Sequence, residues 1–312
     1  MKLINILILG AGGDIGQSIC EILAEIKWIE KKVGTDININ SASSILFDKY
    51  YKVPSCNNIE YIGEISKIIE NEKISMILPV SEPEIRYFFL HNIKSIKNIP
   101  LILANFLSLS IALDKLKTIT FLKKNNLPYP RTQKQVQNIK LEYPIIAKSK
   151  IGSGNKSVIL VKDKIDLQYI KAKFSNYILQ EYLPDDQGEY TCGLFRSTKD
   201  EIRYIVFKRV LKSGYSVSGE IVDNESINNL LVSIANLLDL KGSINIQLRI
   251  VNDIPYIFEI NPRFSSTVRF RDLFGFRDVL WVLQDNLNQK ISDYHKPTAG
   301  AKFFKGYKEY IL

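Results

Sequence analysis

Four residues in the last quarter of the sequence have side chains that could bind a metal ion and a phosphate group: Gln247, Glu259, Asn261 and Arg263. They lie on two runs, INIQLRI and YIFEINPR, which the segment VNDIP joins. If the runs pair as an antiparallel hairpin, Gln247 can face Glu259, and Asn261 follows on the same face. Carboxylate and amide oxygens suit Mg²⁺, and a guanidinium can grip a phosphate. A polar-faced edge hairpin without a ligand explains the same residues, so both interpretations stay open.

The elements that would position these residues are two β-strands and a preceding helix. Apolar and polar residues alternate from Ile244 to Val251, which is the period of a strand with one buried face. Pro262 ends the second run because proline has no N–H for the ladder, and Asn252 with Asp253 suits a tight hairpin turn. Upstream, the segment SINNLLVSIANLLDL has leucine and isoleucine at helical spacing and predicts a helix that packs on the strands.

A lysine and a glycine–serine loop could contribute to phosphate binding. The segment LEYPIIAKSKIGSGNKSVILV predicts strand, loop and strand, with Lys148 at the end of the first strand. The ammonium of Lys148 would pair with the negatively charged polyphosphate, and the backbone N–H groups of Ser153, Gly154 and Asn155 would cover it. No helix follows the loop, so it is not a Walker P-loop, and a surface hairpin with an ordinary lysine remains an alternative. The segment before it, SIALDKLKTITFLKKNN, predicts a single helix that ends at Asn125 and Asn126.

The segment QEYLPDDQGEY could recognise a nucleoside. We expect residues Glu181 to Leu183 to form an extended hinge whose backbone can reach the edge of an adenine. Glu189 could accept hydrogen bonds from two ribose hydroxyls. On composition alone, surface acids in a loop account better for both acidic residues.

The N-terminal part predicts a parallel sheet. After a strand at Ile4 to Leu9, GAGGDIGQ opens a helix, and alternating βα units continue to about Leu103. The glycines resemble a dinucleotide-binding motif in which Asp36 would bind the ribose, so an NAD-dependent oxidoreductase is one alternative. Any tight βα turn also needs glycine, which explains the same residues without a cofactor. Because ligands bind at the carboxyl ends of such strands, Ser81 and Glu82 are candidate substrate residues; acids that begin a helix are the simpler explanation.

Composition narrows the class of protein. The length of 312 residues predicts two domains, or one domain with a substantial second lobe, and the 46% hydrophobic fraction predicts apolar cores. The net charge is +9, but the basic residues are scattered, so a phosphorylated small molecule is favoured over nucleic acid. Three distant cysteines favour a reducing compartment. No run approaches the ~20 apolar residues that cross a bilayer, so we expect a cytoplasmic protein without membrane partners, compatible with a homodimer.

Taken in order, these parts resemble the ATP-grasp superfamily over nearly the whole chain. A Rossmann-like domain, an Asp-Lys helix, a strand-ending lysine with its loop, a Gln-Glu-Tyr hinge and a closing Glu-x-Asn-Pro-Arg follow one another. GSINIQLRI and FEINPRFSSTVRF are most similar to a single synthetase module of the carbamoyl-phosphate synthase large subunit family. The resemblance implies an α/β fold of the α+β ATP-grasp type. It places a Rossmann-like pre-ATP-grasp domain at residues 1–106 and a two-lobed ATP-grasp domain with antiparallel sheets at 107–312, divided into a smaller lobe (107–180) and a larger lobe (181–312).

The resemblance also implies roles for individual residues. Contacts with ATP fall to Lys115, Lys148, Ser153, Gly154, Glu181, Leu183, Glu189 and Gln247. One or two Mg²⁺ ions, for which Mn²⁺ is an alternative, would be held by Gln247, Glu259 and Asn261. The catalytic group would be Arg263, Lys148 and Glu259.

The implied chemistry is ATP-dependent formation of an acylphosphate from a substrate carboxylate, followed by its capture by an amine or ammonia. Arg269 and Arg271 could bind the carboxylate, although surface charge before a helix explains them as well. Ser81 and Glu82 would face the second substrate. A non-catalytic ATP-binding protein is a further alternative, and the sequence does not identify the substrates.

Overall fold

The computed structural model describes residues 3–134, 140–152, 158–306 and 308–311. The N-terminal part contains β1 (Ile4–Leu9), α1 (Asp14–Ala24), β2 (Ile29–Asp36), α2 (Ser43–Leu46), β3 (Lys49–Lys52), α3 (Tyr61–Asn71), β4 (Ile74–Pro79), α4 (Glu82–Leu90), β5 (Ser95–Ile96) and β6 (Ile99–Pro100). The middle part contains α5 (Phe106–Ala112), α6 (Lys115–Lys124), β7 (Thr132–Lys134), β8 (Ile145–Ser149), β9 (Val158–Val161), α7 (Lys164–Lys173) and β10 (Tyr177–Glu181). The C-terminal part contains β11 (Glu189–Arg196), β12 (Ile202–Lys212), β13 (Tyr215–Ile221), α8 (Glu225–Leu237), β14 (Gly242–Val251), β15 (Ile254–Asn261), α9 (Val268–Leu273), α10 (Asp278–Asn286) and β16 (Lys302–Phe304).

The N-terminal part is built on a parallel sheet in the order β3-β2-β1-β4, as the sequence predicted. Leu9 pairs with Thr35 and with Pro79, so the carboxyl ends of three strands meet at one edge. Gly10 has a φ of +69° there, and an added Cβ would lie 2.5 Å from the Cβ of Ser81. Glycine at this turn therefore lets the first strand end directly against the start of α4.

A separate antiparallel sheet in the order β7-β10-β8-β9 forms the smaller lobe. Its side chains alternate, so Ile145 and Ala147 face the lobe's own apolar cluster while Lys148 points to the other face. The prediction of a single helix before this sheet was wrong. The chain forms α5 and α6 instead, because the Asp114 side chain accepts hydrogen bonds from the N–H groups of Leu116 and Lys117 and starts a new helix.

The larger lobe is an antiparallel sheet in the order β15-β14-β11-β12-β13-β16. Helix α8 buries leucines and isoleucines against one face of this sheet. The expected hairpin is confirmed: Val251 pairs with Ile254, and Asn252 and Asp253 between them have φ values of 50° and 62°. Two consecutive positive φ values are the signature of a turn whose twist matches that of the strands.

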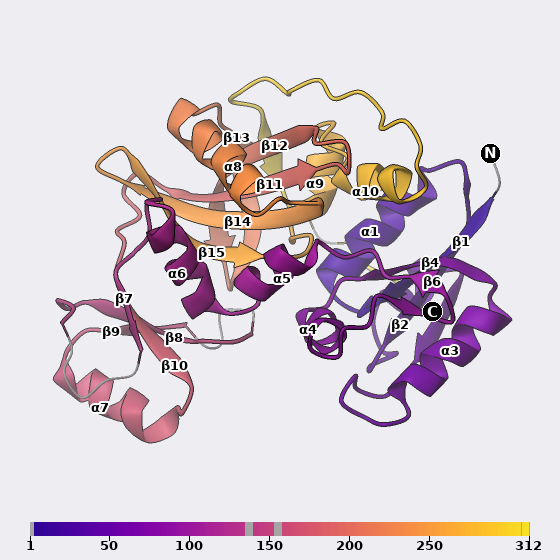
Figure 1. Ribbon diagram of the computed structural model, residues 1–312, viewed down its shortest axis with the longest axis horizontal. Coiled ribbons are helices and arrows are strands. Elements are labelled where there is room, and N and C mark those ends of the chain that lie inside the picture. Colours follow the sequence, from indigo (N-terminus) through magenta and orange to yellow (C-terminus); the bar gives the residue numbers. More distant parts are fainter. Residues whose placement is uncertain (1–2, 135–139, 153–157, 307, 312) are drawn as a thin grey trace.

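The two lobes and the N-terminal sheet lie around α5 and α6 (Figure 1). The larger lobe and the N-terminal part share one apolar cluster, in which α1 packs against α9 and α10. The smaller lobe has its own apolar cluster and lies on the other side of α6 in Figure 1. None of the described helices is long and apolar enough to cross a membrane.

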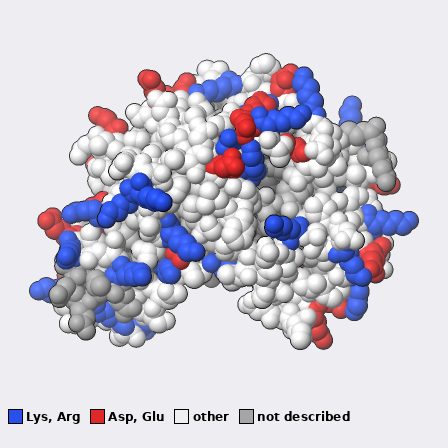
Figure 2. All heavy atoms as spheres, viewed as in Figure 1, with Lys and Arg blue, Asp and Glu red and all other residues white. Residues whose placement is uncertain are grey.

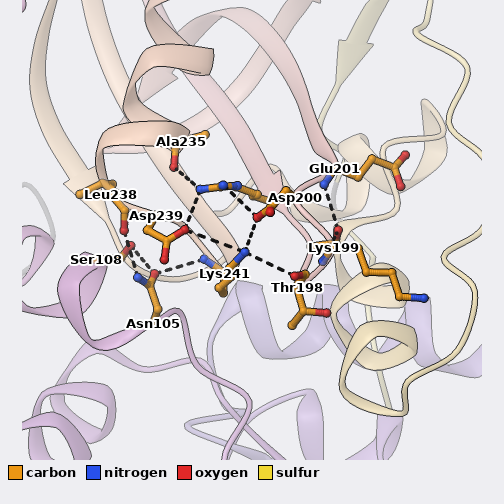
Figure 3. Close-up of polar contacts among 12 residues, drawn as sticks. Asn105, Ser108, Thr198, Lys199, Asp200, Glu201, Ala235, Leu238, Asp239 and Lys241 are labelled. Atoms are coloured by element: carbon orange, nitrogen blue, oxygen red, sulfur yellow. Dashed lines mark hydrogen bonds and ion pairs between the residues drawn. The ribbon is translucent and has the colours of Figure 1, made fainter.

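A polar network attaches the segment between the N-terminal sheet and α5 to the larger lobe (Figure 3). The Asn105 amide donates to the carbonyl oxygen of Leu238 at 3.0 Å, and its side-chain oxygen accepts from the Lys241 N–H at 3.2 Å and from the Ser108 hydroxyl at 2.6 Å. The Lys241 ammonium pairs in turn with Asp200 in the turn between β11 and β12. These contacts fix the path by which the chain leaves the N-terminal sheet.

The C-terminal segment adds the last strand to the larger sheet. Residues Lys302–Phe304 pair with β13, and Phe303 is buried against Phe270 and Phe207, with ring centroids 4.3 and 4.9 Å apart. Phe304, its neighbour, is 74% exposed. The two adjacent phenylalanines of this strand thus differ in burial, because successive side chains of a strand point to opposite faces of the sheet.

We expect Phe303→Ala to lower the free energy of unfolding by about 3–5 kcal/mol, because it removes a buried aromatic ring and leaves a cavity. Phe304→Ala should change it by less than about 0.5 kcal/mol, because an exposed ring contributes little packing. Urea denaturation of the two variants beside the unchanged protein measures both values. A loss of less than about 0.5 kcal/mol in Phe303→Ala as well would show that the C-terminal strand does not belong to the core.

Candidate active site

The hairpin of β14 and β15 places the residues that were expected to bind metal. Gln247 pairs with Glu259 in the register, and Asn245 pairs with Asn261, so the predicted set lies together on one strand pair. The register shifts after Glu259, so that Phe258 is an extra residue in a β-bulge. A bulge frees a backbone carbonyl from the ladder, and here the Phe258 carbonyl oxygen accepts a hydrogen bond of 3.0 Å from the ammonium of Lys148.

Two lysines from different elements converge on Glu259. Lys148 comes from β8 in the smaller lobe, and Lys115, at the start of α6, lies 3.7 Å from a Glu259 carboxylate oxygen and donates to the carbonyl of Gly152. Lys148 is 5% exposed. Burial lowers the pKa of Lys148 to about 8; Glu259 acts against this shift and Lys115 adds to it. The pair of lysines therefore forms a cationic site beside a single carboxylate.

Arg263 follows the hairpin and faces the N-terminal part. Its guanidinium donates to the Phe264 carbonyl at 2.7 Å. Burial lowers the pKa of Arg263, while Glu82, Glu259 and Asp14 act in the opposite direction. Arg263 thus lies between Glu259 and acidic residues in the first turns of α4 and α1.

A cavity of about 150 Å³ adjoins Arg263 at the junction of the N-terminal part and the larger lobe. Pro79, Asn105, Lys241 and Asp285 contribute to its wall. The outline of the molecule is also indented between the smaller lobe and the N-terminal part, and lysine and arginine side chains reach the surface near this indentation (Figure 2).

Two arginines that sequence analysis did not identify form hydrogen bonds with the residues expected to bind the nucleoside. Glu189 receives hydrogen bonds from Arg209 at 2.7 Å and from Arg249 at 2.7 and 3.1 Å. Arg249 also donates to the carbonyl oxygen of Leu183 at 2.6 Å, and Arg209 donates to the side-chain oxygen of Gln247 at 3.0 Å. Arginines 20 and 60 residues away meet Glu189 only because β12 and β14 flank β11, a pairing that no local sequence pattern reveals.

Of the remaining residues that were predicted to bind the nucleotide, the structure describes Glu181 but not the loop residues. The Glu181 carboxylate accepts from the backbone N–H and the guanidinium of Arg131 at 2.8 and 2.6 Å, which fixes the end of β10. Ser153, Gly154 and Asn155 lie outside the described residues.

The predicted substrate residues of the N-terminal part take part in internal contacts. The Ser81 hydroxyl donates to Glu84, and Glu82 pairs with Arg86 at 2.7 Å. Burial raises the pKa of Glu84, although hydrogen bonds from Ser81 and Tyr61 act against the shift. Glu82 still lies close enough to Arg263 to oppose the lowering of the Arg263 pKa by burial, so Glu82 remains a candidate residue for substrate binding.

The glycine turn holds one of the chain's own carboxylates. The Gly12 N–H donates to Asp36 at 2.8 Å, and an added Cβ at Gly12 would lie 2.8 Å from that carboxyl group. Asp36, the residue expected to bind a ribose, thus already accepts a hydrogen bond from the Gly12 N–H, which a bound pyrophosphate would need. This contact weakens the interpretation as an NAD site.

Of the two arginines predicted to bind the substrate carboxylate, Arg271 requires correction, and Arg269 takes part in internal ion pairs. Arg271 is fully buried, donates to Asn245 and lies 3.5 Å from Asp278, so a substrate cannot reach it. Arg269 pairs with Glu25 of α1 at 2.6 Å, and its other nitrogens lie within 4 Å of Glu21 and Asp272. Both arginines hold elements of the fold together, a role that charge in the sequence does not distinguish from binding.

The residues present fit a magnesium ion that phosphate oxygens help to coordinate. Among the described residues no group of three or more His, Cys, Asp and Glu side chains could hold a metal, so carboxylates alone do not form the site. Glu259 and Asn261 offer oxygens, and the Gln247 oxygen keeps one lone pair after accepting from Arg209. Magnesium commonly binds through one or two carboxylates plus substrate phosphates, which this donor set allows.

Comparison with known families agrees with this geometry. The model of the ATP-grasp domain matches residues 112–267, which is half of the chain, and the model of the PylC-like N-terminal domain matches residues 6–102. The chain belongs to the ATP-grasp family. This confirms the predicted family, the fold with its parallel and antiparallel sheets, and the predicted class of ATP-grasp ligase. The boundary at residue 106 stays a prediction.

A curated relative and two solved structures show which members the chain is similar to. It is 25% identical over 308 residues to the carbamoyl phosphate synthase large chain of Methanocorpusculum labreanum, covering 85% of this chain and 28% of that protein. The chain spans less than a third of the length of the curated relatives it matches. Its fold is similar to N5-carboxyaminoimidazole synthetase from Staphylococcus aureus complexed with ADP, with a TM-score of 0.75, 16% identity, and coverage of 94% of this chain and 80% of that chain. The biotin carboxylase domain of Hydrogenobacter thermophilus 2-oxoglutarate carboxylase also has a TM-score of 0.75, with 12% identity and coverage of 97% and 74%.

The lowered pKa of Lys148 predicts a pH-dependent affinity for Mg·ATP. Below pH 8 the ammonium is charged in the nucleotide-free protein, and it loses its proton as the pH rises through that value. If Lys148 binds phosphate, the dissociation constant should increase between about pH 7 and pH 9, by up to about tenfold per unit above the pKa. Isothermal titration calorimetry at several pH values measures this change.

Two variants separate Lys148 from other titrating groups. Lys148→Gln should bind more weakly at pH 7 and show little change up to pH 9. Lys162→Gln, which removes an exposed lysine of the same lobe, should keep the full pH dependence. A wild-type affinity that stays constant over this range would exclude the proposed phosphate contact.

Proposed function

We propose that this chain is an ATP- and Mg²⁺-dependent ligase that forms an acylphosphate from a substrate carboxylate and couples the acyl group to an amine or ammonia. The observation that carries the proposal is the convergence of Lys115, Lys148 and Arg263 around Glu259. Transfer of a phosphoryl group needs positioned positive charge more than a nucleophilic side chain. These cations and this acid meet from three parts of the fold and match that requirement.

In this proposal Lys115 and Lys148 bind the phosphates, and Arg263 stabilises the phosphoryl group during transfer. Glu259 and Asn261, with Gln247 as a further ligand, hold one or two Mg²⁺ ions or Mn²⁺ in their place. A bound magnesium ion would neutralise phosphate charge. The burial of Lys148 and Arg263 supports these roles, because a desolvated cation interacts more strongly with a phosphate than an exposed one.

The nucleoside would lie toward Glu189. In the proposal, residues Glu181 to Leu183 contact adenine, Glu189 contacts the ribose, and Ser153 and Gly154 cover the phosphates. The ADP in the related synthetase structure and the magnesium salt of ADP in the related carboxylase domain support a nucleotide site in this fold.

The reaction balances without a covalent enzyme intermediate. A carboxylate oxygen of the substrate forms a bond to the γ-phosphorus as the bond to ADP breaks. The amine then bonds to the acyl carbon, phosphate leaves with the electrons of the C–O bond, and the amine gives up a proton. The cavity beside Arg263 and the nearby Glu82 and Asp14 support placing both substrates at the junction of the N-terminal part and the larger lobe.

The rival interpretation as an NAD-dependent enzyme can be tested directly. Binding of Mg·ATP should raise the melting temperature of the protein, whereas NAD⁺ should not, because Asp36 occupies the glycine turn. Stabilisation by NAD⁺ alone would contradict the ligase assignment.

Glu259→Gln should retain the fold, lose most of the Mg²⁺ dependence of ATP affinity, and reduce phosphate release by at least about 100-fold. The amide keeps the shape of the side chain but removes the negative charge that attracts the metal. Calorimetry with and without EDTA measures the first effect, and phosphate release over a panel of small carboxylates and amines measures the second. Glu64→Gln, which removes a carboxylate from the exposed side of α3, serves as the matched control.

A Glu259→Gln variant with unchanged Mg²⁺ dependence would remove the metal assignment. Tight ATP binding without phosphate release above background over the whole panel would instead favour the non-catalytic ATP-binding alternative.

A further inference from the structure

Glu189 lies between two arginines on one face of the larger sheet. It is the first residue of β11, and its direct register partners are Arg209 on β12 and Arg249 on β14. Paired residues on adjacent strands project from the same face, so the three side chains meet over the sheet. The Arg209 and Glu189 side chains are 7% and 12% exposed, and that of Arg249 is 22% exposed.

The hydrogen bonds to Glu189 leave little of its acceptor capacity free. A carboxylate has two oxygens with about four lone-pair positions. One N–H of Arg209 reaches the first oxygen, and two nitrogens of Arg249 reach the second at 2.7 and 3.1 Å. About one acceptor position therefore remains, whereas binding both hydroxyls of a ribose would need two.

Further contacts hold both arginines in place. A nitrogen of Arg249 donates to the Leu183 carbonyl at 2.6 Å, and Arg209 donates to Gln247 at 3.0 Å. Moving Arg249 away from Glu189 would break charge-assisted hydrogen bonds to the carboxylate and also free the Leu183 carbonyl, so the arrangement resists opening. Between the two arginines, Arg249 takes the larger share of the acceptor positions of Glu189.

We propose that Arg249 is a specificity-determining residue that limits recognition of the nucleotide sugar to a single ribose hydroxyl. The inference rests on the proposed nucleotide site. It concerns the choice among nucleoside triphosphates that differ at the sugar and is independent of which carboxylate and amine react. The protein then accepts one of the two singly deoxygenated forms of ATP almost as well as ATP itself.

Calorimetry with the magnesium complexes of ATP, 2′-deoxy-ATP and 3′-deoxy-ATP tests the proposal. For the unchanged protein, one of the deoxy nucleotides should bind within about threefold of ATP. In Arg249→Met the freed carboxylate oxygen can accept both hydroxyls, so both deoxy nucleotides should bind about tenfold more weakly than ATP, the effect of one hydrogen bond to a charged group. Arg249→Lys, with one ammonium in place of a two-nitrogen contact, should fall between the two.

Arg196→Met is the matched control. Arg196 ends the same strand, about 23 Å from Glu189 at about 3.3 Å per residue, and pairs with Asp200 and Asp239 at 2.8 and 3.0 Å. Its loss removes arginine–carboxylate ion pairs at the far end of the same strand and should leave the ratios among the three nucleotides unchanged. A merely structural Arg249 would change all three affinities equally.

Several outcomes would overturn the proposal. In the unchanged protein, both deoxy nucleotides binding at least tenfold more weakly than ATP would contradict it, as would wild-type ratios in Arg249→Met. If no nucleotide binds, the proposed ATP site and this inference fall together. If nucleotides bind in the expected ratios but no substrate releases phosphate, only the proposed ligase reaction is wrong.

Discussion

The β-bulge at Phe258 sets the geometry on which the rest of the site depends. It interrupts the hairpin at the residue before Glu259 and presents a backbone carbonyl that Lys148 occupies from the smaller lobe. Through this one hydrogen bond, a lysine on one sheet is held beside a carboxylate on another.

Buried cations give the site its electrostatic character. Lys148 and Arg263 have both lost solvent, and the nearby carboxylates only partly offset that loss, since the pKa of each base stays lowered. A polyanion that enters the site would supply the missing negative charge and recover free energy that folding alone leaves unfavourable. If the site binds a nucleotide as proposed, the buried charges would lower the stability of the nucleotide-free protein and favour phosphate binding.

The sequence predicted local features well and long-range ones poorly. The hairpin, its turn and the pairing of Gln247 with Glu259 follow from residues close together in the chain, and so do the βα units of the N-terminal sheet. The break between α5 and α6 could have been predicted, because Asp114 is a strong helix-capping residue. Arg209 and Arg249 could not, since their meeting with Glu189 depends on which strands become neighbours. Arg271 was misjudged because charge in a sequence does not reveal burial.

The shared apolar cluster decides which parts of the protein are packed together. Because α1 packs into the same core as α9 and α10, the N-terminal part and the larger lobe share one continuous apolar core. The smaller lobe has a separate core, the chain enters it before β7 and leaves it after β10, and polar contacts such as that of Lys150 with Asp114 join it to α6. Lys148 therefore reaches the Phe258 carbonyl oxygen across the boundary between two separately packed cores, so its loss of solvent depends on how those cores meet.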